Sequence, residues 1–176
     1  NIIIELKKLE TRIEFIGILN RSSGIPVITA AELSKHFNIP GVPIKSAKIL
    51  LNKNKMRQGR TKHNIPSPDY KIYSVNKFSY EINKFPIVIK PALSHVGKSG
   101  VSVVYKNNTI NKAVKYAERH TLNNKILIEE YLEGPDLSLV SFVENSKLFP
   151  ICLLEEINYE NGDGSIFPKG YRTLKK

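Results

Sequence analysis

The pattern of apolar and polar positions changes near residue 70, and the segment before that point predicts mainly helices. Residues 13–19 (IEFIGIL) are rich in β-branched and aromatic side chains and predict a strand. Residues 27–37 predict a helix, because proline and threonine start signals and an Ala-Ala-Glu-Leu run fall there. Residues 46–64 predict a second helical stretch, in which Gly59 disfavours one unbroken helix.

From residue 70 onward, short apolar runs alternate with polar turns. Residues 107–121 predict an amphipathic helix, with Asn108 or Thr109 as its N-cap and one apolar stripe. The other predicted elements are a helix at 79–84, strands at 70–75, 86–90, 101–105 and 125–132, and two strands within 137–157 around a turn at 144–147. No closing element is predicted beyond them. The pattern indicates an α+β fold, with a hinge at IPSPDY (65–70) between an N-terminal piece and a main lobe.

Length and composition are those of a globular protein. The chain has 176 residues, of which 41% are hydrophobic, enough for one domain or two small lobes with a real core. No run approaches the roughly 18 apolar residues of a membrane span, and charge interrupts NIIIELKKLETR too early for a signal peptide. The single Cys152 excludes an internal disulfide and fits a reducing compartment, so we expect a cytoplasmic protein.

The net charge of +11, from 27 Lys and Arg against 16 Asp and Glu, is compatible with several anionic partners. Nucleic acid, a membrane surface and a phosphorylated small molecule would all fit it. The lysines are spread through every segment, however, and the densest run, KNKMRQGRTKH, lacks the aromatic residues of a single-strand-binding groove. We therefore expect a generally basic surface, with no nucleic-acid or membrane partner.

The tripeptide Gly97-Lys98-Ser99 follows an apolar strand and suggests a phosphate-binding P-loop. A P-loop needs a further glycine five positions earlier and a helix directly afterwards. Ala92 occupies the position of that glycine, and the following residues, GVSVVY, predict a strand. The loop is therefore not a P-loop, although a glycine-containing loop between two strands can still cover a phosphate group with its backbone N–H groups.

Four segments, in the expected order and spacing, resemble the ATP-grasp superfamily over roughly residues 24–158. They are LNKNKMRQGRTKHNIPSPDY, PIVIKPALSHVGKSGVSVV, AVKYAERHT and ILIEEYLEGPDLSL. The resemblance implies an ATP-grasp fold. Its expected parts are the end of a preceding α/β domain (1–45), a linking helix and turn (46–69), a small lobe (70–134) and the start of a C-terminal lobe (135–176).

The resemblance also implies which residues contact the phosphates of ATP. Lys53 is similar to the first nucleotide lysine of the family, and Lys90 is similar to the second, which pairs with the α- and β-phosphates. An ammonium at the end of a strand that faces a cleft suits this task. The loop resembles the family's flap over the β- and γ-phosphates. Its implied contributors are Ser94, Gly97, Ser99 and Gly100, while Lys98 and His95 depart from the usual Ser and Gly composition.

For the nucleoside, the segment IEEYLEGPD is the most informative. The resemblance implies Glu129 near the exocyclic amine of adenine and Tyr131 and Leu132 as backbone donor and acceptor beside the base. Asp136 stands where the family usually has a glutamate that binds the ribose hydroxyls. We expect Ile89, Ile128 and Leu139 to line the adenine slot.

The implied function is an ATP-dependent ligase that forms C–N bonds. It would activate a small carboxylate as an acyl-phosphate for attack by an amine or similar nucleophile, with ATP and Mg²⁺ as cofactors. No segment stands where the resemblance expects the family's Glu-x-Asn metal ligands, since Glu155, Glu156 and the rest of EEINYENGDG fall too early, so the Mg²⁺ ligands are expected outside this chain. Catalytic residues stay unassigned, with Arg172 a candidate for substrate binding by position only.

Two alternatives remain open beside this interpretation. One is a degenerate ATP-grasp module that binds nucleotide without catalysis, and the other, a nucleic-acid-binding protein, rests on charge alone. A homodimer is also left open.

Overall fold

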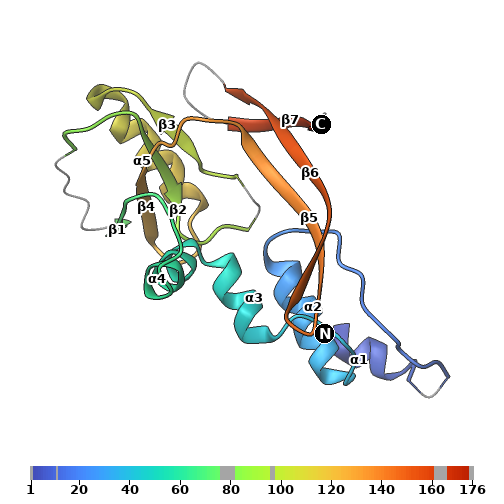
Figure 1. Cartoon of the computed structure of the whole chain (residues 1–176). Helices are drawn as coiled ribbons and strands as arrows, with labels where there is room; N and C mark the ends of the chain where they lie inside the picture. The colour runs from blue at the N-terminus through green and yellow to red at the C-terminus, as the bar shows by residue number, and fades with distance from the viewer. Residues whose placement is uncertain (1, 11, 76–81, 96–97, 161–165, 175–176) are drawn as a thin grey trace.

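A computed structural model describes residues 2–10, 12–75, 82–95, 98–160 and 166–174. Helices come first along the chain, and two separate antiparallel sheets follow (Figure 1). The helices are α1 (Ile2–Lys7), α2 (Ile25–His36), α3 (Ile44–Leu51) and α4 (Lys53–Lys62). Within the described part of the chain, no helix is long and apolar enough to cross a membrane.

The first sheet has four strands in the order β1-β4-β2-β3, and every neighbouring pair is antiparallel. Its strands are β1 (Tyr70–Ser74), β2 (Ile87–Pro91), β3 (Ser102–Val104) and β4 (Lys125–Glu130). A short 3-10 turn, η2 (Asn107–Thr109), and the helix α5 (Ile110–His120) connect β3 to β4. These elements confirm the strands and the amphipathic helix that the sequence predicts in this region.

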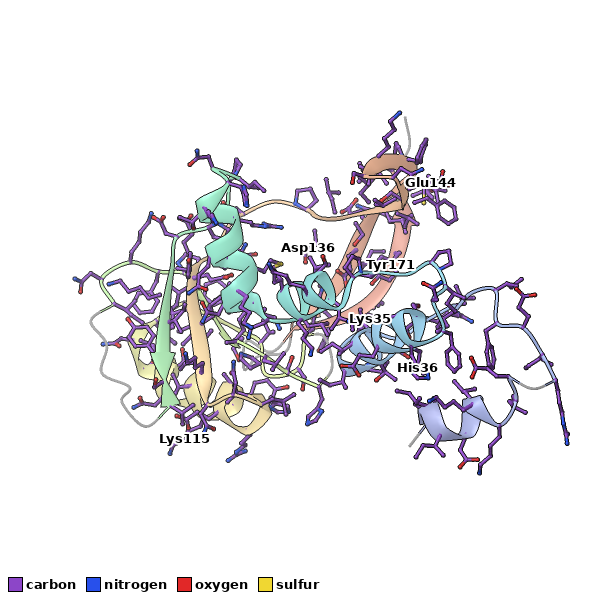
Figure 2. The ribbon with its side chains drawn as sticks, turned by 90° about the horizontal axis from the view of Figure 1, so that it is seen from below. Lys35, His36, Lys115, Asp136, Glu144 and Tyr171 are labelled. Atoms are coloured by element: carbon purple, nitrogen blue, oxygen red, sulfur yellow. The ribbon has the colours of Figure 1, made fainter. Side chains whose placement is uncertain are left out.

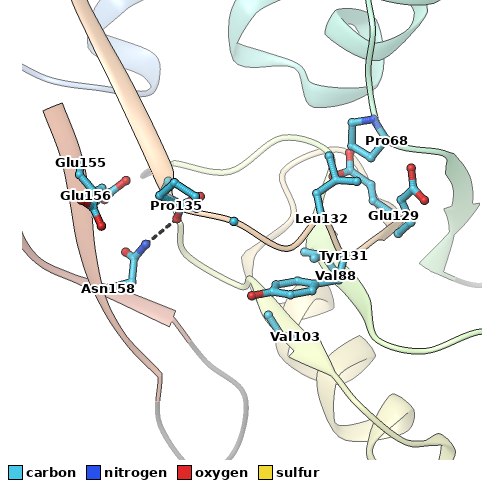
Figure 3. A pocket seen from close by; sticks show the side chains of 13 residues that line it. Pro68, Val88, Val103, Glu129, Tyr131, Leu132, Pro135, Glu155, Glu156 and Asn158 are labelled. Carbon is cyan, nitrogen blue, oxygen red and sulfur yellow. Dashed lines mark hydrogen bonds between the residues drawn. The ribbon is translucent and has the colours of Figure 1, made fainter. Parts of the chain in front are cut away.

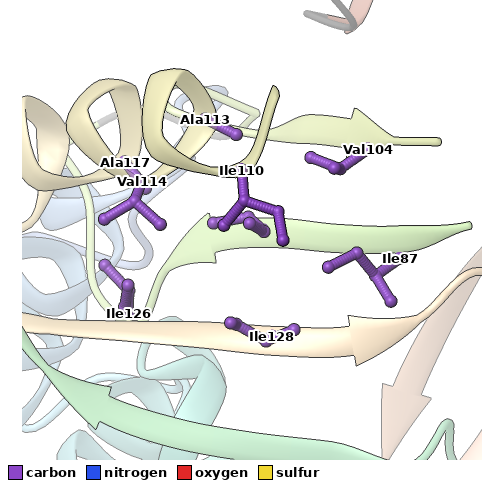
Figure 4. Packing of buried hydrophobic residues seen from close by; sticks show 9 residues of the cluster. Ile87, Val104, Ile110, Ala113, Val114, Ala117, Ile126 and Ile128 are labelled. Carbon is purple, nitrogen blue, oxygen red and sulfur yellow. The ribbon is translucent and has the colours of Figure 1, made fainter. Parts of the chain in front are cut away.

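The hydrophobic core lies between α5 and one face of the first sheet (Figure 4). The apolar stripe of α5 supplies Ala113, Val114 and Ala117, and the small alanines let the helix approach the strands closely. The full cluster consists of Ile87, Ile89, Val104, Ile110, Ala113, Val114, Ala117, Ile126 and Ile128. One face of the sheet is thereby covered, and its opposite face is left to α4 and the pocket described below.

The second sheet has the order β5-β6-β7 and is also antiparallel. Its strands are β5 (Asp136–Glu144), β6 (Lys147–Glu160) and β7 (Ile166–Thr173). Asn145 and Ser146 join β5 to β6 with φ angles of 48° and 63°. Two consecutive residues with positive φ make the kind of tight turn that matches the twist of a hairpin, and this confirms the predicted turn.

The strand β7 is an element that the sequence did not predict. Its segment contains Pro168, which has no N–H for a ladder hydrogen bond, and Gly170, which has no side chain to pack. The register shifts between Ile157 and Asn158, opposite these residues, so an irregularity accommodates them. Pairing with the long strand β6 therefore overrides an unfavourable local sequence.

Three predicted elements differ from the structure. The strand expected at 13–19 is wrong: the segment has no regular structure, and Ile16 and Leu19 are 85% and 89% exposed, because no described strand pairs with it. The helix expected at 46–64 is two helices, divided at Asn52, whose extended backbone ends α3 and whose side chain accepts a hydrogen bond from the Lys55 N–H.

The third difference is the helix expected at 79–84. Its residues 82–84 are not helical, and its residues 79–81 lie outside the described residues.

Candidate functional site

A pocket of about 420 Å³ lies between the two sheets (Figure 3). The first sheet contributes an apolar wall, Val88 and Val103, which are cross-strand partners on the face opposite α5. The second sheet contributes a polar wall. The lining residues are Pro68, Val88, Val103, Glu129, Glu130, Tyr131, Leu132, Gly134, Pro135, Asp136, Glu155, Glu156 and Asn158. An apolar wall facing a few polar groups is typical of a small-molecule site.

Residues 131–135 form the floor that joins these walls, because they connect β4 of the first sheet to β5 of the second. The N–H of Tyr131 donates to the carbonyl oxygen of Pro86 over 3.3 Å. The Tyr131 N–H, which was expected to donate to a base, is thus engaged within the protein, which leaves the Leu132 N–H as the candidate donor. Gly134 has a φ of 136°, a conformation that side-chain-bearing residues rarely adopt, so glycine is required there.

Glu129, at one end of the pocket, belongs to a buried cluster of charges. The Arg57 Nε donates to Oε1 of Glu129 over 2.7 Å, and the Arg57 Nη2 donates to Oε2 over 3.1 Å. The Lys90 ammonium also contacts Oε2. Arg57 and Glu129 are only 7% and 4% exposed, so two cations from α4 and β2 neutralise a carboxylate that is largely buried.

Strand periodicity explains why these groups meet. Ile89 and Ile128 point to the α5 side of the sheet, so the alternate residues Lys90 and Glu129 point to the opposite side, where α4 lies. The backbone N–H of Lys53, the first residue of α4, donates to the Ala92 carbonyl over 2.8 Å. This bond fixes the start of α4 just beyond the end of β2.

The lysines of this cluster have perturbed ionisation. Burial lowers the pKa of Lys53 below its ordinary value, and the charge of Lys90 lowers it further against the opposing charge of Glu129. Burial also lowers the pKa of Lys90, although Glu129 partly offsets this effect. The structure thus brings the two predicted nucleotide lysines into one electrostatic cluster.

Glu129 shows the converse effect. Burial raises its pKa, but the hydrogen bond from Arg57 and the charge of Lys90 outweigh burial and hold the pKa below its usual value. Three cationic side chains, Lys53, Arg57 and Lys90, therefore surround one ionised carboxylate. The excess of positive charge in a poorly solvated place favours an anion.

The glycine-containing loop reaches across to the second sheet through Lys98. The Lys98 Nζ lies 2.8 Å from Oε1 of Glu156, 2.8 Å from Oδ1 of Asn158 and 3.9 Å from Oδ2 of Asp136. Asn158 also donates from Nδ2 to Oδ2 of Asp136 over 2.5 Å. The predicted ribose residue Asp136 therefore sits in a polar group that includes Glu156 and Asn158, neither of which the sequence assigned to a site.

The other predicted loop residues have different surroundings. Ser94 is buried and Ser99 is half-buried, whereas Gly97 lies outside the described residues. Gly100 has a φ of 76°, and a Cβ there would lie 2.8 Å from the Cβ of His120. Packing against α5 and a left-handed backbone are thus sufficient reasons for glycine at this position.

The predicted adenine slot is wrong in its apolar residues. Ile89 and Ile128 belong to the core under α5, and Leu139 on β5 is 51% exposed and not part of the pocket lining. Val88 and Val103 line the pocket instead. Ile89 was expected on the wrong face of the sheet. A shift by one residue along a strand, from Ile89 to Val88, moves the side chain to the other face.

The two glutamates of the pocket wall on β6, Glu155 and Glu156, are each paired with a cation. Arg172 donates from Nε and Nη2 to the two carboxylate oxygens of Glu155, both over 2.9 Å, and thereby holds the pKa of Glu155 below its usual value. Among the residues with defined positions, no group of three or more His, Cys, Asp or Glu could hold a metal ion. We therefore assign no metal ligand among them and derive no step through a metal ion.

Two antiparallel sheets that enclose a pocket, with buried lysines at one end and a glycine-containing loop over it, define an ATP-grasp fold. Solved structures with this fold are similar to the chain. The L-amino acid ligase from Bacillus licheniformis has a TM-score of 0.67 at 18% identity, over 88% of this chain and 35% of that one. The D-alanine–D-alanine ligase from Bacillus anthracis has a TM-score of 0.65 at 17% identity, over 98% of this chain and 58% of that one.

The family is shown by sequence. The chain belongs to the phosphoribosylglycinamide synthetase ATP-grasp (A) domain family, whose model matches residues 51–164. It is similar to the phosphoribosylamine–glycine ligase of Pyrococcus horikoshii, at 30% identity over 85% of this chain and 34% of the relative. The corresponding ligase of Methanocella arvoryzae is 25% identical over 77% of this chain and 34% of the relative. The chain therefore spans about a third of the length of these curated relatives.

Proposed function

We propose that this chain carries the nucleotide-binding part of an ATP-dependent ligase, which activates a carboxylate as an acyl-phosphate for attack by an amine. The observation that carries the proposal is the pocket between the sheets, with an apolar wall in the middle and the buried cluster of Lys53, Arg57 and Lys90 beside Glu129 at one end. The ligase names of the relatives support the same reaction class.

The pocket suggests an orientation for ATP. The adenine ring would lie against Val88 and Val103, and its edge would meet the Tyr131 carbonyl and the Leu132 N–H. Both carboxylate oxygens of Glu129 are already engaged by Arg57 and Lys90, so the expected contact of Glu129 with the exocyclic amine is not part of the proposal. Asp136 would accept hydrogen bonds from the ribose hydroxyls. Asp136 already accepts one from Asn158, which fixes the direction of its carboxylate.

The phosphates would extend toward Lys90 and Lys53 and beneath the loop that contains Ser94, Gly97, Ser99 and Gly100. In the proposed reaction a carboxylate oxygen attacks the γ-phosphorus, the bond to the bridging oxygen breaks, and ADP leaves. The amine then attacks the acyl carbon, the C–N bond forms, and inorganic phosphate leaves. The lysines hold and neutralise the phosphates throughout.

The same proposal includes the arrangement of domains. Residues 1–45 would end a preceding α/β domain, residues 46–69 would link it to the small lobe of residues 70–134, and residues 135–176 would begin the C-terminal lobe. The carboxylate and the amine would bind outside the pocket described above.

Isothermal titration of ATP with Mg²⁺ into the full-length protein tests the first half of the proposal. We expect saturable binding, and its absence would overturn the proposal. Release of ADP with each member of a panel of small carboxylates and amines tests the second half. ATP binding without ADP release on any pair would instead support a nucleotide-binding module that has lost catalysis.

A further inference from the structure

The carboxylate of Glu129 is shared by two cations from distant parts of the chain. Arg57 comes from α4 and Lys90 from β2, whereas Glu129 itself lies on β4, between β1 and β2 in the first sheet. Figure 3 shows Glu129 at the pocket end beside Pro68, away from the acidic residues of the second sheet. One side chain thus links the helix, the sheet and the pocket.

We infer that Arg57 is a positioning residue, which holds Glu129 and through it sets the Lys90 ammonium at the phosphate end of the pocket. The inference rests on the proposed function, in which Lys90 contacts the phosphates of ATP. Neither the family pattern in the sequence nor the contacts expected for ATP assigned a role to Arg57.

The geometry of the ion pair supports this role. Arg57 engages both carboxylate oxygens at once, over 2.7 and 3.1 Å, and such a two-point contact fixes the plane of the carboxylate as well as its charge. Lys90 then meets the oxygen Oε2, whose position Arg57 has set. A single-point contact would leave the carboxylate free to rotate and Lys90 free to follow it.

Electrostatics gives a second reason. If Lys90 were the only cation beside Glu129, the pair would neutralise itself, and little positive charge would remain for a phosphate. Because Arg57 also pairs with the carboxylate, the negative charge of Glu129 offsets the positive charge of Lys90 only in part. The remaining positive charge can attract an anion. Lys53 lies within electrostatic range of both Lys90 and Glu129, and Arg60 lies within range of Lys90, so the excess of positive charge is extended further.

Arg57 also holds α4 against the sheet. The only described backbone bond between α4 and the end of β2 joins the Lys53 N–H to Ala92, at the first residue of the helix. The Arg57–Glu129 pair adds a second attachment one turn later, and the hydroxyl of Thr61 bonds the Arg57 carbonyl within the helix. A loss of Arg57 would thus move Lys53 as well as Lys90.

The decisive variant is the double substitution Arg57→Met with Glu129→Gln. It removes one positive and one negative charge, so the net charge of the cluster is unchanged, but the Lys90 ammonium loses its carboxylate partner. The glutamine keeps the length of the side chain and one acceptor oxygen for Lys90. Lys55→Met serves as the control, because it removes an exposed cation from the same helix.

Affinities for ATP and for adenosine, together with the melting temperature of the full-length protein, give the readout. Because Lys90 loses its carboxylate partner, we expect the double variant to melt below the wild type and, where it stays folded, to bind ATP about tenfold more weakly, with adenosine affinity changed less than about twofold. Arg57→Lys, which retains charge but not the two-point contact, should lose about threefold in ATP affinity alone. This second variant tests the inference if the double variant does not fold.

Each outcome separates the inference from the function on which it rests. A wild-type protein that binds no ATP overturns the proposed function and the inference together. Wild-type binding with unchanged ATP affinity in Arg57→Lys, or in a folded double variant, overturns the inference alone. Parallel losses for ATP and adenosine also overturn it, because they would place the effect at the base and not at Lys90.

Discussion

The Lys98 ammonium lies 2.8 Å from Oε1 of Glu156, and this pair joins the loop of the first sheet to the second sheet across the pocket. Lys98 is the lysine of the Gly-Lys-Ser tripeptide, yet its partners are acids of the pocket's polar wall and not a helix N-terminus. Lys98 therefore acts as a contact between the two sheets in this protein.

The first prediction compares Lys90→Ala with Lys98→Ala. We expect Lys90→Ala to weaken ATP binding by about tenfold or more, since it removes a largely buried cation from the end of the pocket where the phosphates are proposed to lie, and Lys98→Ala to weaken it less. Titration of ATP measures both. Lys115→Ala is the control, because Lys115 is exposed on α5 and lies well away from Asp136 in Figure 2. Equal effects of the first two variants would mean that the phosphates lie elsewhere.

The second prediction concerns the uptake of protons when ATP binds at alkaline pH. The pKa values of Lys53 and Lys90 are lowered by burial, so at alkaline pH below 10.5 each amine is partly neutral in the folded protein. Phosphate charge favours the protonated amines, so ATP binding at about pH 9 should take up protons. Titrations in two buffers of different ionisation enthalpy measure the uptake. Lys90→Met should remove much of it and Lys115→Met none, and proton release by the wild type would contradict the prediction.

The lowered pKa values of Lys53 and Lys90 also predict the direction in which the free energy of unfolding changes with pH. Between the folded-state values and 10.5, the unfolded chain binds more protons than the folded chain. The contribution of these two lysines to the free energy of unfolding therefore rises with pH across this window. Chemical denaturation of the wild type and of Lys90→Met at several alkaline pH values checks this. A wild-type contribution that falls over the same window would contradict the direction.

The third prediction uses two neighbouring residues on opposite faces of β2. Ile89→Ala should lower the free energy of unfolding by about 3 kcal/mol, because it leaves a cavity in the core under α5. Val88→Ala should lower it by only about 1 kcal/mol but weaken adenosine binding several-fold. Denaturation and titration of both variants separate the two faces. If Ile89→Ala is the variant that selectively weakens adenosine binding, the pocket wall is misassigned.

The fourth prediction concerns Gly100, whose φ is 76° and whose Cβ would lie 2.8 Å from the Cβ of His120 and 3.1 Å from Pro91. Gly100→Ala should lower the free energy of unfolding by about 2 kcal/mol, which chemical denaturation measures. Gly59→Ala is the matched control of opposite sign, since Gly59 lies in α4 and a Cβ added to it would meet nothing within 4 Å. It should stabilise the protein by about 0.5–1 kcal/mol. A neutral Gly100→Ala would show that the loop relaxes without strain.

Local patterns predicted most of the first sheet and its helix. The apolar run around Ile89 and the stripe of α5 are strong signals, because burial on one face dictates their spacing. The split at Asn52 was missed because a cap in the middle of a helical pattern resembles any other polar residue. The strand β7 was missed because pairing with β6 outweighs its Pro168 and Gly170.

The site was predictable only in part. The resemblance pointed to Lys53, Lys90 and Asp136, and the structure places the first two in one cluster and the third at the pocket wall. Arg57 and Asn158 could not have been found, because an ion pair between residues 72 apart and a hydrogen bond between residues 22 apart leave no local signal. The resemblance alone also did not place the adenine wall, which depends on the face that each strand residue occupies.

The five residues 131–135 have a consequence for motion. They are both the floor of the pocket and the covalent link between the sheets, so a turn of one sheet against the other must pass through the backbone on which a base would rest. A ligand that binds there would contact the only covalent connection between the two described sheets, so its binding would favour one angle between them.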